Sequence, residues 1–274
     1  MATTTTSTTP GAWSPDVAAY TALDVIPEAL ILQTSTVVGS IEGDEPAVRV
    51  PWVDLDDTVG FVAEGAPIPE NSSTYNETVV QTGKIATLGK FSREQLEQPN
   101  AAQLVVNSLS RSVVNKANMA YLGNAADPTG LLNVVGITDG GTLGVDLDSL
   151  ADAVLGIEAE GGQATHIIAA PGAWGAVAKM KGATGSAVPL LGAGTEQAER
   201  RVLGVPVLVT SAAPADTLLV VDSSAIVSAV GSVQLARSED AFFGSDVVGI
   251  RVTFRLGWAA MKPERIVKIS TTTV

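Results

Sequence analysis

The sequence has 274 residues, a formal net charge of −13 at pH 7 and no cysteine, which excludes disulfides, thiolate metal sites and a cysteine nucleophile. The acidic balance argues against an intrinsic nucleic-acid binder, because phosphate affinity comes from lysine and arginine. Only 16% of the residues are charged. This low charge density indicates either that much of the surface is buried in interfaces with other subunits, or that the protein has a Gly/Ala-rich surface with few charges.

Residues 1–45 are expected to form an N-terminal arm. The opening MATTTTSTTP is of low complexity and lacks the basic and apolar regions of a secretory signal. Residues 17–32 predict a short helix interrupted at Pro27, and residues 37–53 predict extended chain. No apolar run approaches 18 residues, so we expect no membrane-spanning segment and no membrane partner.

Residues 46–91 predict a projecting arm and a strand that returns from it. Pro67 and Pro69 favour extended backbone, so no helix fits between them. Residues 50–83 contain no lysine or arginine but six carboxylates, namely Asp54, Asp56, Asp57, Glu64, Glu70 and Glu77. The aspartates do not match the spacing of a calcium-binding loop, so a solvated acidic loop is expected. An arm with little apolar surface needs something to lie against, such as another subunit.

Residues 92–144 contain the clearest helix signal of the chain. Ser92 and Gln95 fit a capping box, and Pro99 then interrupts the helix. Beyond it, apolar residues recur at helical spacing along one stripe, at Ala102, Val106, Leu109, Val113, Ala117 and Ala120. They predict a helix of about twenty residues, roughly 30 Å long. Gly123 is expected just past its end.

Residues 145–274 predict a mixture of helices and strands. Helices are expected over residues 146–161 and from Pro171 to about Lys181. Strands are expected over residues 165–170, 205–210, 217–221, 226–236, 246–258 and 265–271. Because helices and strands do not alternate strictly, the fold class is α+β rather than α/β.

The sequence offers no recognisable catalytic constellation. The only histidine, His166, begins an apolar strand and is expected to be a structural residue with satisfied hydrogen bonds. No Walker A loop or G-x-S-x-G elbow is present. We therefore expect a protein that is not an enzyme and that has no cofactor and no metal site.

An ordered set of motifs runs along the chain. The set comprises VAEG at 62–65, a Pro-Glu pair at 69–70, FSREQL at 91–96, the long helix, LGN…PTGLLN at 122–133 and RVTFRLGWAAMKPERIVKI at 251–269. Taken in this order, the motifs resemble the tailed-bacteriophage major capsid proteins with the Hong Kong 97 fold. The resemblance implies an N-terminal arm at 1–45 and an E-loop with its return strand at 46–91. It implies a peripheral domain with a spine helix at 92–144, an axial domain at 145–240 and return strands of the peripheral domain at 241–274.

The resemblance also implies a function. The chain would be a major capsid (head) protein that forms hexamers and pentamers of an icosahedral shell around double-stranded DNA, without sequence-specific binding. It would be assembled in the host bacterial cytoplasm and reside in the virion capsid, with a portal and a decoration protein as partners. Because the initiator methionine directly precedes the arm, we expect a separate scaffold protein or none. An encapsulin-type nanocompartment shell is the main alternative, followed by an adhesive or tail structural protein.

The distribution of charge predicts contacts between subunits. Most basic residues lie in two segments that the resemblance assigns to the peripheral domain, and those expected at the interface are Lys90, Arg93, Arg111, Lys116, Arg251 and Arg255. Their contacts with a neighbour's acidic E-loop would set the register of assembly. The alternative is that both are separate solvated faces worth little each.

Some members of the family crosslink their shells through a lysine–asparagine isopeptide bond assisted by a glutamate. Counting from the matching motifs, these three positions carry Glu77, Asp246 and Thr253. A carboxylate supplies no amine nucleophile, and threonine is no general base here. We therefore expect no isopeptide crosslinking of this type.

Overall fold

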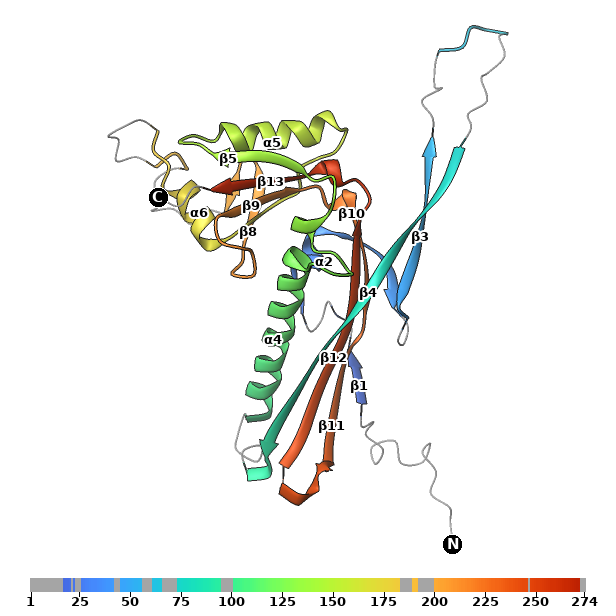
Figure 1. Ribbon diagram of the computed structural model, residues 1–274, viewed down its shortest axis with the longest axis vertical. Helices are drawn as coiled ribbons and strands as arrows, with labels where there is room; N and C mark the ends of the chain where they lie inside the picture. Colours follow the sequence, from blue (N-terminus) through green and yellow to red (C-terminus); the bar gives the residue numbers. More distant parts are fainter. Residues whose placement is uncertain are drawn as a thin grey trace.

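The computed structural model describes residues 17–20, 22, 26–41, 45–55, 61–65, 73–94, 101–182, 189–191, 200–245 and 247–271 (Figure 1). Two β-sheets, one long and one short, organise these residues, and helices cover one face of each. Helix and strand are therefore mixed, as expected for an α+β protein. Within this part of the chain no helix is both long and apolar enough to cross a membrane.

The long sheet has seven strands and is built mainly from the two ends of the chain. They are β1 (Val17–Tyr20), β2 (Thr36–Ile41), β3 (Ala47–Leu55), β4 (Ser73–Ser92), β10 (Ile226–Gly231), β11 (Val233–Phe242) and β12 (Val247–Ala260). β12 lies at the centre and pairs antiparallel with β4, β10 and β11. The long strand β4 then continues past β12 and pairs with β3 as the projecting arm (Figure 1).

Helix α4 (Ala101–Gly123) packs on one face of the long sheet. Leu109, Val113 and Ala117 of the predicted stripe are buried there against alternate residues of β12. Side chains alternate between the two faces of the sheet along β12. Val252, Phe254 and Leu256 point toward α4, so the residues between them point to the opposite face of the sheet. The helix prediction is confirmed.

The end of helix α4 differs from the prediction, because Gly123 belongs to the helix and does not have positive φ. The amide of Asn124 still bonds the carbonyl oxygen of Ala120, 3.0 Å away. The side-chain amide of Asn133, at the end of the 3-10 helix η2 (Leu131–Asn133), donates to the carbonyl oxygens of Gly123 and Asn124 at 3.1 and 2.9 Å. A side chain thus satisfies the terminal carbonyls that we expected a glycine turn to satisfy.

The short sheet has six strands in the order β5-β13-β9-β6-β8-β7. They are β5 (Thr138–Leu143), β6 (His166–Ala169), β7 (Arg201–Val202), β8 (Val205–Val209), β9 (Thr217–Val221) and β13 (Ile266–Thr271). Helices α5 (Asp148–Ala159) and α6 (Pro171–Ala178) pack on it through residues such as Leu150, Ile157 and Val177. Most of these elements match the predicted ranges.

Three local predictions need correction. Residues 17–20 form β1, because they pair with β11, and the only helix described between 26 and 41 is the short α2 (Leu30–Thr34). The single strand expected at 226–236 divides at Ser232 into β10 and β11, which both pair with β12. Helix α6 ends at Ala178, earlier than expected. In each case pairing with distant strands or tertiary packing overrides a local signal.

The chain passes between the two sheets at different residues from the expected domain boundaries. β10 and β11, expected in the axial domain at 145–240, belong to the long sheet, whereas β13, expected with the return strands at 241–274, belongs to the short sheet. One passage runs from helix α4 through η2 into β5, and the other two lie in the 3-10 helices η3 (Ser223–Ala225) and η5 (Pro263–Arg265). A further 3-10 helix, η4 (Phe243–Ser245), connects β11 to β12 within the long sheet.

Candidate assembly surfaces

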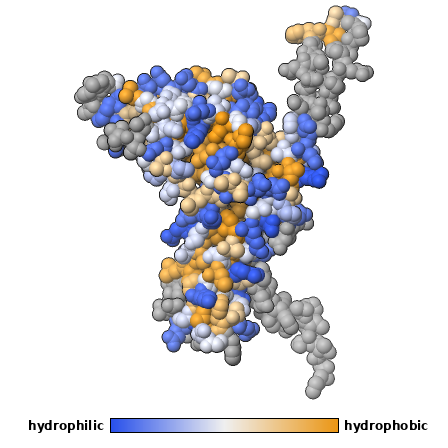
Figure 2. Space-filling model, viewed as in Figure 1, coloured by the Kyte–Doolittle hydropathy of each residue, from blue (hydrophilic) through white to orange (hydrophobic). Residues whose placement is uncertain are grey.

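The projecting arm carries the acidic residues predicted to face another subunit. Glu64 lies in the exposed segment 61–65 at its tip, next to Phe61 and Val62. Both apolar side chains are exposed, and Figure 2 shows the apolar patch that they form at the end of the arm. Exposed apolar residues on a slender projection are typical of a contact site. Asp54 lies in β3, while Asp56, Asp57 and Glu70 fall outside the described residues.

Glu77 has a partner within its own chain, which the sequence prediction missed. Its carboxylate lies 3.1 Å from the guanidinium Nη1 of Arg49, a diagonal cross-strand neighbour on β3. Arg49 stands just before the acidic segment that was counted from residue 50. Both side chains are more than half exposed, so this pair contributes little stability. It does reduce the charge that Glu77 presents to a neighbour.

The face of the long sheet turned away from helix α4 is basic. Arg251 and Arg255 of β12 lie opposite Leu88 and Lys84 of β4, and Lys90 follows along the same strand. Lys84, Leu88, Lys90 and Arg251 are exposed. None of the residues that β4 and β12 place on this face, within 84–92 and 247–255, is a carboxylate. We call these residues, Lys84, Lys90, Arg251 and Arg255, the basic sheet face.

A shallow cavity of about 290 Å³ opens on the basic sheet face. Lys84, Arg251 and Arg255 contribute its positive charge, and Thr253 lies between the two arginines in β12. Arg255 is held in place, because its Nη1 donates to the carbonyl oxygen of Glu45 at 3.1 Å and to the hydroxyl of Thr82 at 2.9 Å. Thr253 itself is buried. The cavity therefore presents fixed positive charge to whatever lies on the sheet.

The structure does not bring all the predicted basic residues together. The ammonium of Lys90 lies 4.3 Å from the centre of the Phe242 ring, within cation–π range, at the far end of the basic sheet face. Arg93 follows directly after β4. Arg111 and Lys116, however, lie on the exposed side of helix α4, on the opposite side of the sheet. The six residues form two surfaces rather than one.

The structure describes two of the three positions expected to match the residues of the isopeptide crosslink. Glu77 lies in β4 within the arm and Thr253 in the middle of β12, paired with Ala86 and Gln234. Asp246 falls outside the described residues. Across the described part of the chain, no group of three or more histidine or carboxylate side chains is arranged to hold a metal ion.

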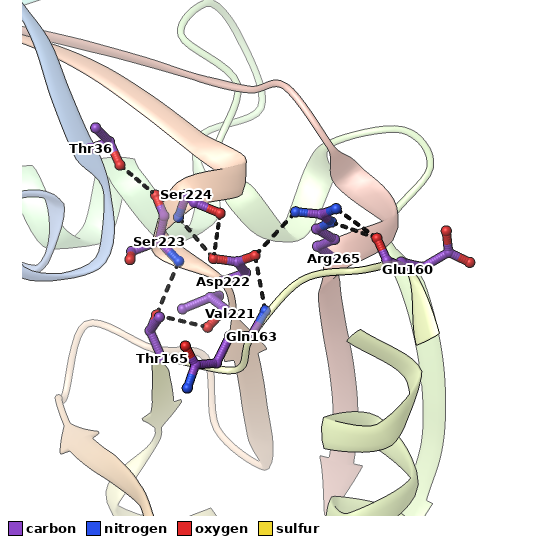
Figure 3. Close-up of polar contacts among 9 residues, drawn as sticks. All are labelled: Thr36, Glu160, Gln163, Thr165, Val221, Asp222, Ser223, Ser224 and Arg265. Carbon is purple, nitrogen blue, oxygen red and sulfur yellow. Dashed lines mark hydrogen bonds and ion pairs between the residues drawn. The ribbon is translucent and has the colours of Figure 1, made fainter. Parts of the chain in front are cut away.

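A polar cluster that sequence reasoning missed lies where the chain passes between the two sheets (Figure 3). Asp222 caps η3: its Oδ1 accepts from the amide and the hydroxyl of Ser224, at 2.9 and 2.7 Å. Its Oδ2 accepts from the amide of Gln163 at 3.3 Å and lies 3.5 Å from Nη1 of Arg265. The sequence signals available were the Asp-Ser-Ser run after an apolar strand and the Gly161-Gly162 pair before Gln163.

His166 lies close to this cluster at the start of β6. Its Nδ1 is buried without a hydrogen-bond partner among the described residues, contrary to the expectation of a satisfied histidine. Removal from water disfavours the charged imidazolium, so burial lowers the pKa of His166 below its usual range. Burial therefore favours the neutral form of the imidazole in the folded protein.

A family model described as the phage capsid family matches residues 26–271 of this chain. The chain belongs to the phage capsid family. The match covers both sheets except β1, together with helix α4 and the arm, so the resemblance inferred from the motifs is confirmed. This capsid protein matches no curated protein significantly.

Solved capsid structures share the fold of this capsid protein at low sequence identity. The capsid of a native GTA particle superimposes with a TM-score of 0.68 at 19% identity, covering 88% of this chain and 89% of that chain. A structure titled Mycobacterium phage Bobi gives 0.68 at 14% identity with full coverage of both chains. A virus-like particle from Pyrococcus furiosus gives 0.59 at 15% identity, covering 90% and 95%.

Proposed function

We propose that this capsid protein is the major head protein of a tailed bacteriophage, and that it self-assembles through hexamers and pentamers into an icosahedral shell enclosing double-stranded DNA. The observation that carries the proposal is the family match over residues 26–271. The fold agrees with it, since an arm with an exposed apolar tip projects from the body. The shell would be assembled in the host bacterial cytoplasm.

In this proposal the elements take the roles of the Hong Kong 97 fold. The β3–β4 arm is the E-loop, helix α4 is the spine helix, and the long sheet with α4 forms the peripheral domain. The short sheet with α5 and α6 forms the axial domain at the capsomer centre. These roles follow the two sheets rather than the boundaries expected from the sequence.

The shell is held together by non-covalent contacts in this proposal. Glu77 and Thr253 do not supply the amine and the general base of an isopeptide reaction. The acidic arm of one copy instead lies against a basic surface of another, either the basic sheet face or the exposed side of α4 with Arg111 and Lys116. Complementary charge sets which surfaces meet more than how tightly they bind. The chain itself performs no catalysis and needs no cofactor.

Further partners would complete the particle. A portal closes one vertex, a separate scaffold guides assembly or is absent, and a decoration protein adds stability to the outer surface. None of these partners requires sequence-specific DNA contacts from this chain, whose net charge of −13 avoids adhesion to the packaged DNA.

The alternative function is an encapsulin-type shell that encloses protein cargo. It is favoured by the likeness to the virus-like particle from Pyrococcus furiosus. Nuclease treatment of particles purified from the natural source separates the two functions. Particles of a phage head retain nuclease-protected double-stranded DNA, whereas particles that retain only a co-purifying protein would contradict the phage proposal.

A further inference from the structure

Two of the three passages of the chain between the sheets meet at one place. The first follows β9 through η3 into β10, and the second follows β12 through η5 into β13. The amide of Met261 donates to the carbonyl oxygen of Ala225 at 2.8 Å, and the amide of Asp222 donates to that of Arg265 at 3.3 Å. The passages are therefore bonded to each other at both ends.

Side chains join this crossing to the elements on either side of it. Arg265 donates from Nε and Nη2 to the carbonyl oxygen of Glu160, just after α5, at 3.1 and 2.6 Å. Thr36, the first residue of β2 in the long sheet, donates to the carbonyl oxygen of Ser223 at 3.0 Å. The amide of Ser223 donates to the hydroxyl of Thr165 at 3.0 Å. Figure 3 shows that Asp222 lies at the centre of these contacts.

The charged groups at the centre are removed from solvent. The side chain of Asp222 is 3% exposed and that of Arg265 is 13% exposed. A buried ion pair of this kind contributes little net stability, but loss of one partner leaves an uncompensated charge. Its contacts are directional, whereas the apolar packing between the two halves of the molecule is not. These contacts hold the end of β9, the start of β13 and the loop after α5 in one arrangement at the junction with the long sheet.

Gly162 shows how closely the parts of this cluster approach. A Cβ atom at this residue would lie 2.7 Å from Oδ2 of Asp222 and 2.8 Å from Cδ of Arg265. Even the smallest side chain would push the loop between α5 and β6 away from the ion pair. Gly162 is thus a position at which geometry can be changed without removing any charge.

We infer that the cluster of Gly162, Asp222 and Arg265 fixes the angle between the two sheets and thereby sets the curvature of the shell. The inference rests on the proposed shell function, because curvature is defined only for an assembled particle. A small change of angle in each copy is repeated around the whole shell, so the size of the particle is a sensitive measure of it.

The test compares shells formed by the wild-type protein with those of Gly162→Ala, Arg265→Lys and Asp222→Asn. Gly156→Ala is the matched control, since it adds the same methyl group on nearby α5 where nothing lies within 4 Å. Electron microscopy gives the distribution of diameters, and circular dichroism with thermal melting identifies variants that are folded. Arg265→Lys keeps the charge and is the variant expected to fold if the others do not.

We expect one diameter for the wild type and Gly156→Ala, and a broadened or shifted distribution, or open sheets, for folded variants of the cluster. Folded cluster variants with the wild-type distribution would overturn the inference. If the wild type forms no shell, hydrogen exchange tests the cluster separately. The amides of Gln163 and Ser224 should then exchange about tenfold faster in Asp222→Asn, as loss of a charge-assisted hydrogen bond predicts. Unchanged exchange there would equally overturn it.

Discussion

The ring of Tyr121 on helix α4 packs edge-on against the ring of Trp258 on strand β12, with centroids 5.4 Å apart and planes at 83°. Both side chains are buried. The indole N–H of Trp258 also donates to the carbonyl oxygen of Thr129 at 2.7 Å. Helix, sheet and the segment after the helix therefore meet at one aromatic pair, which fixes α4 on the long sheet.

Replacement of Trp258 by phenylalanine should lower the free energy of unfolding by about 1–3 kcal/mol, because the partly buried carbonyl of Thr129 loses its donor. Chemical denaturation measures the change. Trp52→Phe is the control. Because the side chain of Trp52 on β3 is only partly buried, this substitution should change the free energy of unfolding much less. Equal effects of the two substitutions would contradict the role given to the Trp258 hydrogen bond.

Asn133→Ala should destabilise the end of helix α4. The variant removes two hydrogen bonds to helix carbonyls, and we expect a loss of about 1–2 kcal/mol. Asn115→Ala, in the middle of the same helix and exposed, should have no such cost, since alanine favours helix. Amide exchange near residue 123 should rise only in Asn133→Ala; protection unchanged there would count against this capping contact.

Stability should fall in mild acid through His166. Its pKa is lowered in the folded state, so the unfolded chain binds the proton more readily. The unfolding free energy is then highest above about pH 6.5 and decreases as the pH falls through the folded pKa, by at most about 1.4 kcal/mol per pH unit. His166→Asn should show a smaller decrease over the same range in parallel denaturation curves. Identical pH profiles for the two proteins would contradict it.

Charge reversal should separate assembly from folding. Arg251→Glu changes the exposed centre of the basic sheet face, and we expect it to slow or block assembly while leaving the melting temperature nearly unchanged. Lys179→Glu makes the same change of charge on the exposed end of α6 and serves as the control. Light scattering follows assembly, and normal assembly of Arg251→Glu would exclude the basic sheet face as the contact for the acidic arm.

Denaturing gels of mature particles should show only the monomer band of 27.9 kDa after boiling in detergent. This prediction rests on the proposed alignment, in which Glu77 and Thr253 take the positions expected to carry the lysine and the glutamate in crosslinking members of the family. A ladder of covalent oligomers would contradict the non-covalent shell.

The sequence predicted elements whose signal is local, and it missed relationships that depend on distant pairing. The apolar stripe of α4 and the apolar run of β9 are visible in a short window, because period and burial coincide there. β1 was misread as helix, since its structure comes from pairing with β11 more than 200 residues away. Asp222 and Arg265 are 43 residues apart and show no spacing pattern, so only the fold brings them together.

The surfaces proposed for assembly were predicted only in part, because their arrangement also depends on pairing between distant strands. Sequence position places Arg111 and Arg251 in two basic segments that the resemblance assigns to one domain, but the helical and strand periods direct them to opposite sides of the sheet. Arg49 lies one residue before the segment 50–83 that contains no lysine or arginine, so the sequence did not indicate it as a partner of that segment. Pairing of β3 with β4 nevertheless places Arg49 beside Glu77. The numbers of acidic and basic residues in each segment thus predicted a polar interface. Which charged side chains share a surface could be determined only from the register of β3, β4 and β12.

Electron microscopy of the chain expressed alone, together with size-exclusion chromatography, tests the central claim most directly. The account predicts closed shells or rings of five and six subunits, with particle diameters uniform within a preparation. A protein that remains monomeric at high concentration, both alone and when co-expressed with its neighbouring genes, would contradict the assignment of a self-assembling capsid shell.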